Sequence, residues 1–150
     1  MKALIQRVKR ASVSVDGERV SEIGKGLLVF LGIMKGDTPT NASRLAEKIS
    51  GLRIFDDGRG KMNLSALDLN LEILVVSQFT LAADTRRGRR PSFADAAPPE
   101  EAEELCERFA AFLETNLKVA RGRFRAMMDV ELVNDGPVTI MLEDPSRGEA

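Results

Sequence analysis

Two hydroxyl groups and one carboxamide follow a short apolar run near the middle of the chain. The run Ile73–Val76 is continuous in aliphatic residues, and Ser77, Gln78 and Thr80 come directly after it. Such runs are typical of a strand buried on both faces, which would hold these polar groups on a stiff element. Side chains placed in this way can be preorganised for catalysis, or they can do no more than hydrogen-bond the neighbouring backbone.

The chain contains no histidine. Nucleophiles activated by an imidazole are therefore excluded, and the commonest metal ligand is missing. The sequence also lacks a glycine-rich phosphate loop of the Walker or Rossmann type, so we expect no metal and no cofactor. An enzyme built from this chain must activate water through a carboxylate, a backbone group or the substrate itself.

Four arginines lie within five positions of one another, shortly after the polar groups; they are Arg86, Arg87, Arg89 and Arg90. The whole protein carries a net charge of -1, so only local clustering of positive charge could attract nucleic acid. Arginine forks match phosphate oxygens, and we interpret the cluster as a nucleic-acid or phosphate contact beside the site. A solvated charged loop is the alternative.

A second unusual segment, 134–137, reads Asn-Asp-Gly-Pro and separates two apolar runs, Met128–Val133 and Val138–Leu142, which we expect to be strands. Asp-Gly could close a hairpin between them, while Pro137 removes a backbone donor from the second strand. The sequence alone does not decide whether the Gly136–Pro137 peptide bond is cis.

The remaining patterns predict the elements that position these groups within one domain, residues 1–150. Helices are expected near Thr38–Leu52, with Thr38 as N-cap, and near Pro98–Leu117. Cys106 falls in the second helix and is interpreted as a small buried residue. Strands are expected at Lys2–Val8, Ala11–Val15, Glu18–Val20, Leu27–Ile33 and Leu52–Phe55.

No apolar run approaches the roughly 20 residues that span a bilayer, so we expect no membrane segment. The first residues become charged too soon for a signal peptide, which favours a cytoplasmic protein.

Taken together, Ser77-Gln78-Phe79-Thr80 and the segment 134–139 resemble the paired motifs of the D-aminoacyl-tRNA deacylases. The resemblance spans nearly the whole chain and includes the stretches 3–8, 26–32, 60–64 and 82–93. One position departs from it, since Arg125 stands where a small residue is expected.

The resemblance implies an α/β (α+β) fold, with layered mixed β-sheets that form a barrel-like core and two main helices, in three layers α/β/β. It implies a cytoplasmic homodimer that binds tRNA and hydrolyses the ester between a D-amino acid and the terminal adenosine. It further implies chiral proofreading by rejection of L-aminoacyl substrates, and activity on glycyl-tRNA mischarged on tRNA-Ala.

The resemblance also assigns residues. It implies that Gly136 and Pro137 form a cis dipeptide that enters the partner subunit's pocket and excludes L side chains. Arg7 is expected to fix this dipeptide. The substrate-binding group also includes Asn134 and Thr139.

Backbone atoms near Phe79 are expected to bind the substrate, with Ser77 and Gln78 beside them. Thr80 is a catalytic candidate, although no base for it is visible in the sequence. The substrate's own ribose 2'-hydroxyl is the alternative source of the chemistry, with the protein supplying position.

Two other functions stay open. A non-catalytic RNA-binding module would explain the arginine cluster, but it would usually carry exposed aromatics, and this chain has no Trp or Tyr. An esterase for small free substrates is the second alternative, which the missing histidine and the arginine cluster disfavour.

Overall fold

A long N-terminal strand, β1 (Lys2–Val15), organises the sheet in the computed structural model, which describes residues 1–145. The first half of β1 pairs antiparallel with β3 (Gly26–Gly32), and its second half pairs antiparallel with β2 (Glu18–Ile23). Strand β8 (Asp129–Glu143) pairs along the opposite edge of β1. Asp16 and Gly17 both have positive φ and form the predicted turn between β1 and β2.

The middle of the sheet is parallel and fully covered. β3 pairs parallel with β6 (Glu72–Ser77), which in turn pairs parallel with β7 (Lys118–Arg121). All four residues of the apolar run 73–76 are buried, because alternate side chains enter two separate cores. This two-sided burial confirms the interpretation of the run as a covered strand.

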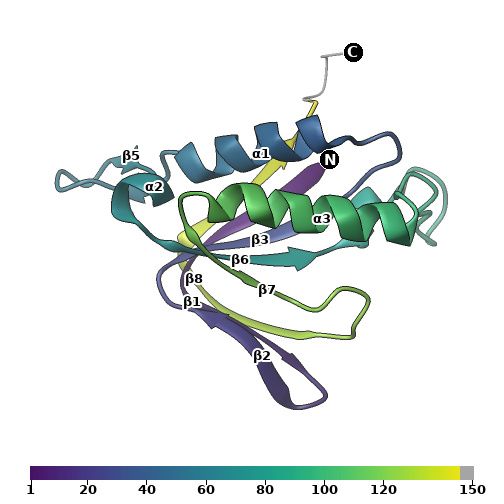
Figure 1. Ribbon diagram of the computed structural model, residues 1–150, viewed down its shortest axis with the longest axis horizontal. Helices are drawn as coiled ribbons and strands as arrows, with labels where there is room; N and C mark the ends of the chain where they lie inside the picture. The colour runs from purple at the N-terminus through teal and green to yellow at the C-terminus, as the bar shows by residue number, and fades with distance from the viewer. Residues whose placement is uncertain (146–150) are drawn as a thin grey trace.

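One core lies between the sheet and two helices, α1 (Pro39–Gly51) and α3 (Pro99–Glu114), which run side by side over one face (Figure 1). Val29, Leu45 and Phe109 are fully buried there. The second core, with Val13 and Leu74, is enclosed where the sheet curls and β2 and β8 cover its other face. The result is the expected barrel-like α+β architecture.

Both predicted helices are present. Helix α1 begins with Pro39, and its N-cap Thr38 donates a backbone hydrogen bond to Asn41 Oδ1 at 2.8 Å. Helix α3 begins with Pro99 and ends at Glu114, three residues before the predicted end.

The smaller elements differ more from expectation. The strand predicted at 52–55 is reduced to β4 (Phe55–Asp56), which pairs with β5 (Met62–Leu64). A one-turn helix, α2 (Ala66–Leu69), was missed, and so was β7. Ser65 caps α2 by accepting a hydrogen bond from the Asp68 amide, a local interaction that compensates for the weak apolar pattern.

The predicted hairpin at the C-terminal end is wrong. The two apolar runs do not pair with each other, because both belong to the continuous strand β8 and pair with β1. Asn134 pairs with Val8 and Thr139 with Gln6, so the four residues 135–138 bulge out opposite the single residue Arg7. A proline that cannot donate to the ladder is compatible with such a bulge.

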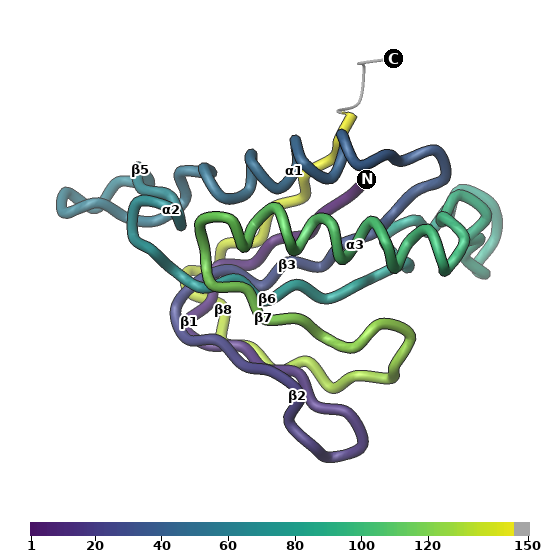
Figure 2. The backbone as a smooth tube through the Cα atoms, in the orientation of Figure 1, coloured from purple at the N-terminus to yellow at the C-terminus, as the bar shows by residue number. Residues whose placement is uncertain are grey.

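The N-terminus lies beside the end of β8, as the backbone trace shows (Figure 2). The amino group of Met1 donates hydrogen bonds to Asp37 Oδ1 and to the Asp144 carbonyl oxygen, both at 2.9 Å. The last five residues of the domain expected at 1–150 lie outside the described range. No helix within 1–145 has the length and apolar character needed to cross a membrane.

Candidate active site

A cavity of about 710 Å³ opens at the carboxyl end of β6. Its walls come from the end of β3, the turn after β6, the beginning of α3 and the loop 122–128. Ser77, Gln78 and Phe79 line it together, so the structure brings these three predicted site residues to one cavity. The loop 122–128 was not predicted as a wall, because its sequence has no periodic pattern.

The turn after β6 is held tightly against β3. The Gln78 amide donates to the Leu31 carbonyl oxygen at 2.8 Å, and residues Phe79–Ala82 then form a short 3-10 helix, η1. A Cβ on Gly32 would lie 2.9 Å from Leu81 Cβ and 3.1 Å from the Gln78 carbonyl oxygen. Gly32 therefore allows the close approach that places η1 beside the cavity.

The start of η1 leaves two amide groups without intrahelical partners. Its first intrahelical donor is Leu81, which bonds the Gln78 carbonyl oxygen at 3.2 Å. The N–H groups of Phe79 and Thr80 precede this donor, so no carbonyl of η1 can accept from them.

Thr80 lies apart from the cavity walls. Its side chain is exposed, and its hydroxyl oxygen accepts a hydrogen bond from Gln78 Nε2. Within residues 1–145, none of its hydrogen bonds joins it to a carboxylate or an amine. The Phe79 ring is 60% exposed and meets Phe93 edge to face, with ring centroids 5.2 Å apart.

Cys106 also lines this cavity, from helix α3. Burial raises the pKa of its thiol to about 12, and the neighbouring Glu107 carboxylate adds to this shift. The thiol is therefore neutral at physiological pH. A neutral thiol agrees with a packing role, since the thiolate is the nucleophilic form, but Cys106 is half-buried and not buried as expected.

A second cluster of predicted site residues lies at the bulge in β8. Arg7 is 6% exposed, and its Nε and Nη1 donate to the carbonyl oxygens of Asp135 and Ile54, each at 2.7 Å. The next peptide bond along the chain, Gly136–Pro137, is cis, and both residues are exposed. Arg7 therefore contacts the carbonyl group just before this dipeptide.

Hydrogen bonds from the Asn134 side chain join the two ends of the bulge. Its carboxamide accepts from the Val138 amide at 2.7 Å and donates to the Val138 carbonyl oxygen at 3.2 Å. The same carboxamide donates to the Thr139 hydroxyl at 3.0 Å, and Gln6 donates to that hydroxyl at 3.2 Å. Gly136 has φ +148, and a Cβ there would lie 2.8 Å from Val138 Cγ2, so the bulge requires glycine.

The two clusters do not meet within one copy of the chain. Arg7 pairs with Leu27, and Leu27 pairs with Ile73, so the bulge lies level with the beginning of β6. Ser77 is four residues further along β6, about 13 Å at strand spacing. Arg7 is also separated from β6 by the intervening strand β3, so the bulge and the cavity lie at different parts of the sheet.

The predicted arginine cluster forms an exposed loop, and its members are not equivalent. Arg86 binds Asp84 through its side chain at 2.7 and 2.9 Å, and these hydrogen bonds lower the pKa of the Asp84 carboxyl to about 2. Arg87, Arg89 and Arg90 are exposed and form no ion pair with any residue in the range 1–145. Three of the four charges are therefore free for a partner.

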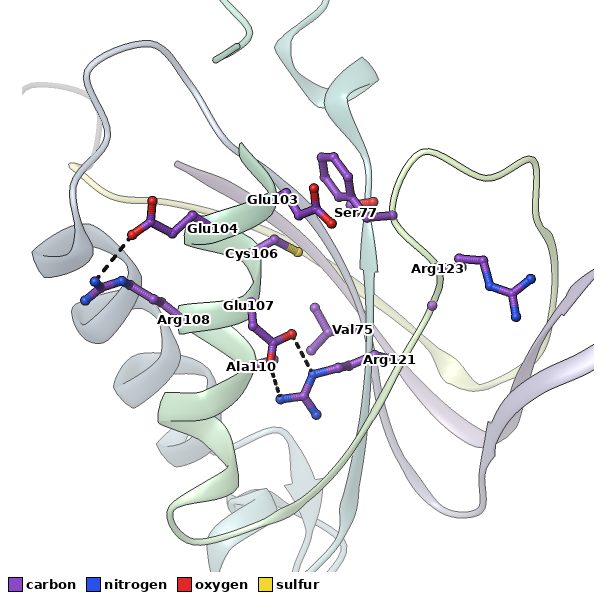
Figure 3. Close-up of a pocket in the computed structure, with 12 residues that line it drawn as sticks. Val75, Ser77, Glu103, Glu104, Cys106, Glu107, Arg108, Ala110, Arg121 and Arg123 are labelled. Carbon is purple, nitrogen blue, oxygen red and sulfur yellow. Dashed lines mark hydrogen bonds and ion pairs between the residues drawn. The ribbon is translucent and has the colours of Figure 1, made fainter. Parts of the chain in front are cut away.

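A second cavity of about 640 Å³ lies between α3 and β7, next to the first (Figure 3). Arg121, which the sequence did not single out, donates to Glu107 at 2.8 and 2.9 Å and also binds Glu114. These bonds fasten β7 to α3, so we interpret Arg121 as structural. Among residues 1–145, no group of three or more Cys, Asp or Glu side chains converges as a metal site would require.

Comparison with known proteins now gives the class. Residues 4–143 match a family of hydrolases whose description is D-Tyr-tRNA(Tyr) deacylase. Because the match covers almost the whole chain, the protein belongs to this family.

Relatives and solved structures agree. The D-aminoacyl-tRNA deacylase of Thermotoga petrophila is 58% identical over 144 residues, which cover 95% of this chain and 97% of the relative. The Geobacter sulfurreducens protein of the same name is 55% identical over 151 residues, which cover 100% and 99%.

Among solved structures, one described as c-Myc DNA Unwinding Element Binding Protein superposes with a TM-score of 0.92 and 45% identity, over 97% of this chain and 100% of that one. A probable eukaryotic D-amino acid tRNA deacylase has a TM-score of 0.81 at 17% identity, over 94% and 97%, and supports the fold alone.

Proposed function

We propose that the protein hydrolyses the ester bond between a D-amino acid and the terminal adenosine of tRNA, releasing both. The observations that carry this proposal are the cavity at the end of β6, which Phe79 lines, and the start of η1, where the amides of Phe79 and Thr80 have no intrahelical acceptor. Its volume is in the range typical of small-molecule sites and suits an aminoacyl-adenosine group. Family membership and the names of the relatives support the same reaction.

The chemistry needs little proton transfer from the protein. Attack on the ester carbonyl forms a tetrahedral oxyanion, which the two amides stabilise, typically by about 3 to 4 kcal/mol for one good donor. The ribose 2'-hydroxyl of the substrate assists the attack, because the chain has no histidine and no base among residues 1–145 contacts the Thr80 hydroxyl. Ser77 and Gln78 position the ester and its water.

Chiral selection comes from a second copy of the chain. In a two-fold homodimer, the exposed Gly136–Pro137 dipeptide of one copy reaches the cavity of the other. Its carbonyl oxygens accept hydrogen bonds from the α-amino group and leave no room for an L side chain. Arg7, Asn134 and Thr139 hold the dipeptide in place. Glycine has no side chain to exclude, so glycyl-tRNA mischarged on tRNA-Ala is also a substrate.

The arginine loop binds the tRNA part of the substrate. The free arginines of the loop bind phosphates of the acceptor end, so aminoacyl-tRNA is the partner. We place the protein in the cytoplasm, where charged tRNA is found, as a homodimer of one domain that spans residues 1–150. It needs neither metal nor cofactor.

The test is to incubate the protein with D-tyrosyl-tRNA, L-tyrosyl-tRNA and free D-tyrosine ethyl ester. The proposal predicts hydrolysis of D-tyrosyl-tRNA only. Binding of tRNA without hydrolysis would identify an RNA-binding module, and cleavage of the ethyl ester would identify a small-substrate esterase.

The role of Thr80 is tested separately. Thr80→Ala should keep most of the activity, whereas D-tyrosyl-tRNA that ends in 2'-deoxyadenosine should be cleaved slowly by both proteins. Loss of activity in Thr80→Ala with folding intact would make the threonine the nucleophile.

A further inference from the structure

One charged side chain lines the cavity at the end of β6, among the described residues that form its walls. It belongs to Arg125, in the loop 122–128. Cys106 is the one other ionisable wall residue in the described range, and its raised pKa keeps it neutral. The other wall residues are apolar or uncharged polar, so Arg125 brings the one formal charge among the described residues that line the cavity.

The backbone at Arg125 is unusual for its residue type. The Ala126 amide donates to the Arg123 carbonyl oxygen at 3.2 Å, which closes a turn with Arg125 at its third position. Arg125 has φ +64 there, a conformation that glycine adopts most readily. This explains why a small residue is expected at the position, and the turn keeps the arginine despite its strain.

The guanidinium of Arg125 has no partner within residues 1–145. No carboxylate there forms an ion pair or hydrogen bond with it, and Arg125 is an exposed residue of the cavity wall. Arg121, in the same part of the chain, is by contrast bound by two glutamates. Arg125 is therefore free to bind an anion that enters with the ligand.

We infer that Arg125 binds the phosphate on the 5' side of the substrate's terminal adenosine, an inference that rests on the proposed function. In an aminoacyl-adenosine end, the carboxyl group is esterified, the α-amino group is positive, and the base and ribose are neutral. The nearest negative charge is this phosphate. A guanidinium attracts it and repels the α-amino group, so Arg125 also orients the ester within the cavity.

Three D-tyrosyl esters separate this role from others: the ester of whole tRNA, of adenosine 5'-monophosphate, and of adenosine without phosphate. We expect Arg125→Gln to lower kcat/KM roughly 10-fold on the two phosphorylated substrates, and less than about 2-fold on the adenosine ester. Arg125→Lys should recover part of the loss, because it keeps the charge without the fork.

Arg123→Gln is the matched control. Arg123 lies in the same loop but does not line this cavity, and its guanidinium points away from α3 (Figure 3). The Arg123→Gln variant should leave the ratio of kcat/KM between phosphorylated and unphosphorylated substrates unchanged. Arg125→Gly relieves the positive φ, so it should show the same substrate pattern as Arg125→Gln at an equal or higher melting temperature.

Two results would overturn the inference: an equal loss on all three substrates, or a loss on tRNA alone, which would place the phosphate elsewhere. Binding of uncharged tRNA provides a readout that needs no activity. Its salt slope should fall by about 0.7 in Arg125→Gln and not in Arg123→Gln. If the unaltered protein hydrolyses none of the esters, the proposed function fails. If the salt slope of tRNA binding is also unchanged in Arg125→Gln, the role of Arg125 in phosphate binding fails as well.

Discussion

Arg7 and Asp135 are joined by a hydrogen bond of 2.7 Å from the guanidinium Nε to the backbone carbonyl oxygen, at the bulge where β8 departs from β1. The same side chain donates to the Ile54 carbonyl oxygen, also at 2.7 Å. One buried arginine thus fixes the bulge to the loop before β4. The position of the exposed Gly136–Pro137 dipeptide depends on this contact.

Arg7→Ala should therefore lower both stability and activity. Two carbonyl oxygens lose their donor, which costs about 1 to 3 kcal/mol for each group left buried and unsatisfied. Arg7→Lys should recover little, because one ammonium cannot reproduce the fork. Urea denaturation and single-turnover hydrolysis of D-tyrosyl-tRNA measure the two effects. Arg10→Ala, on the exposed side of the same strand, is the control, and an equal loss there would contradict the assigned role.

The contribution of the Phe79 amide can be isolated by comparing two variants that both lack the ring. Phe79→Pro deletes both the ring and the N–H group, whereas Phe79→Ala deletes the ring alone. Proline suits the first position of a helix, because its φ is preorganised and the Phe79 amide has no intrahelical partner. We expect Phe79→Pro to be about 100- to 1,000-fold slower than Phe79→Ala in single-turnover assays. Equal rates in two folded variants would exclude this amide as an oxyanion donor.

The arginine loop should act through three of its four charges. Replacing Arg87, Arg89 and Arg90 by Ala should weaken tRNA binding and reduce the slope of log affinity against log salt by about 2 to 3. Arg86→Ala should change the slope less, since Asp84 already neutralises Arg86. Filter binding at several salt concentrations provides both slopes. Identical slopes in all variants would mean that the loop is only solvated surface.

Cys106 should make stability fall at alkaline pH. Its folded pKa, about 12, is above its ordinary value of 9.0, so the folded state keeps a proton that the unfolded state loses. This contribution is complete below pH 9 and is lost between about pH 9 and 12, at up to about 1.4 kcal/mol per pH unit. Urea denaturation of the unaltered protein and Cys106→Ala at pH 8 and pH 10.5 should show a smaller decrease for the variant. Parallel decreases would contradict the burial of the thiol.

The sequence predicts the covered strands and both long helices because their patterns are local. Ile73–Val76 has no polar position, and Thr38 followed by Pro39 is a common local signal for the start of a helix. The bulge in β8 could not be predicted in this way. Asn134–Pro137 carries turn chemistry, and only the long-range pairing of both flanking runs with β1 turns a hairpin signal into a bulge.

Only part of the candidate site could be predicted from local sequence patterns. Ser77, Gln78 and Phe79 follow a strand and are found by pattern, whereas the wall 122–128 has no periodicity and is placed by contacts far apart in sequence. The pairing of Arg86 with Asp84 depends on a turn in the loop, so the sequence could not separate it from the three free arginines.

The central claim is that chiral hydrolysis occurs in a site built from two copies of the chain. Phe79→Pro damages the cavity and Arg7→Ala damages the bulge, so neither variant alone should cleave D-tyrosyl-tRNA efficiently. A homodimer that forms at random from an equal mixture contains half mixed pairs, each with one intact site, so the mixture should recover about a quarter of the unaltered activity. The measurement is single-turnover cleavage of D- and L-tyrosyl-tRNA by the co-refolded mixture. Our account predicts recovery on the D substrate alone, and no recovery despite proven mixed dimers would contradict it.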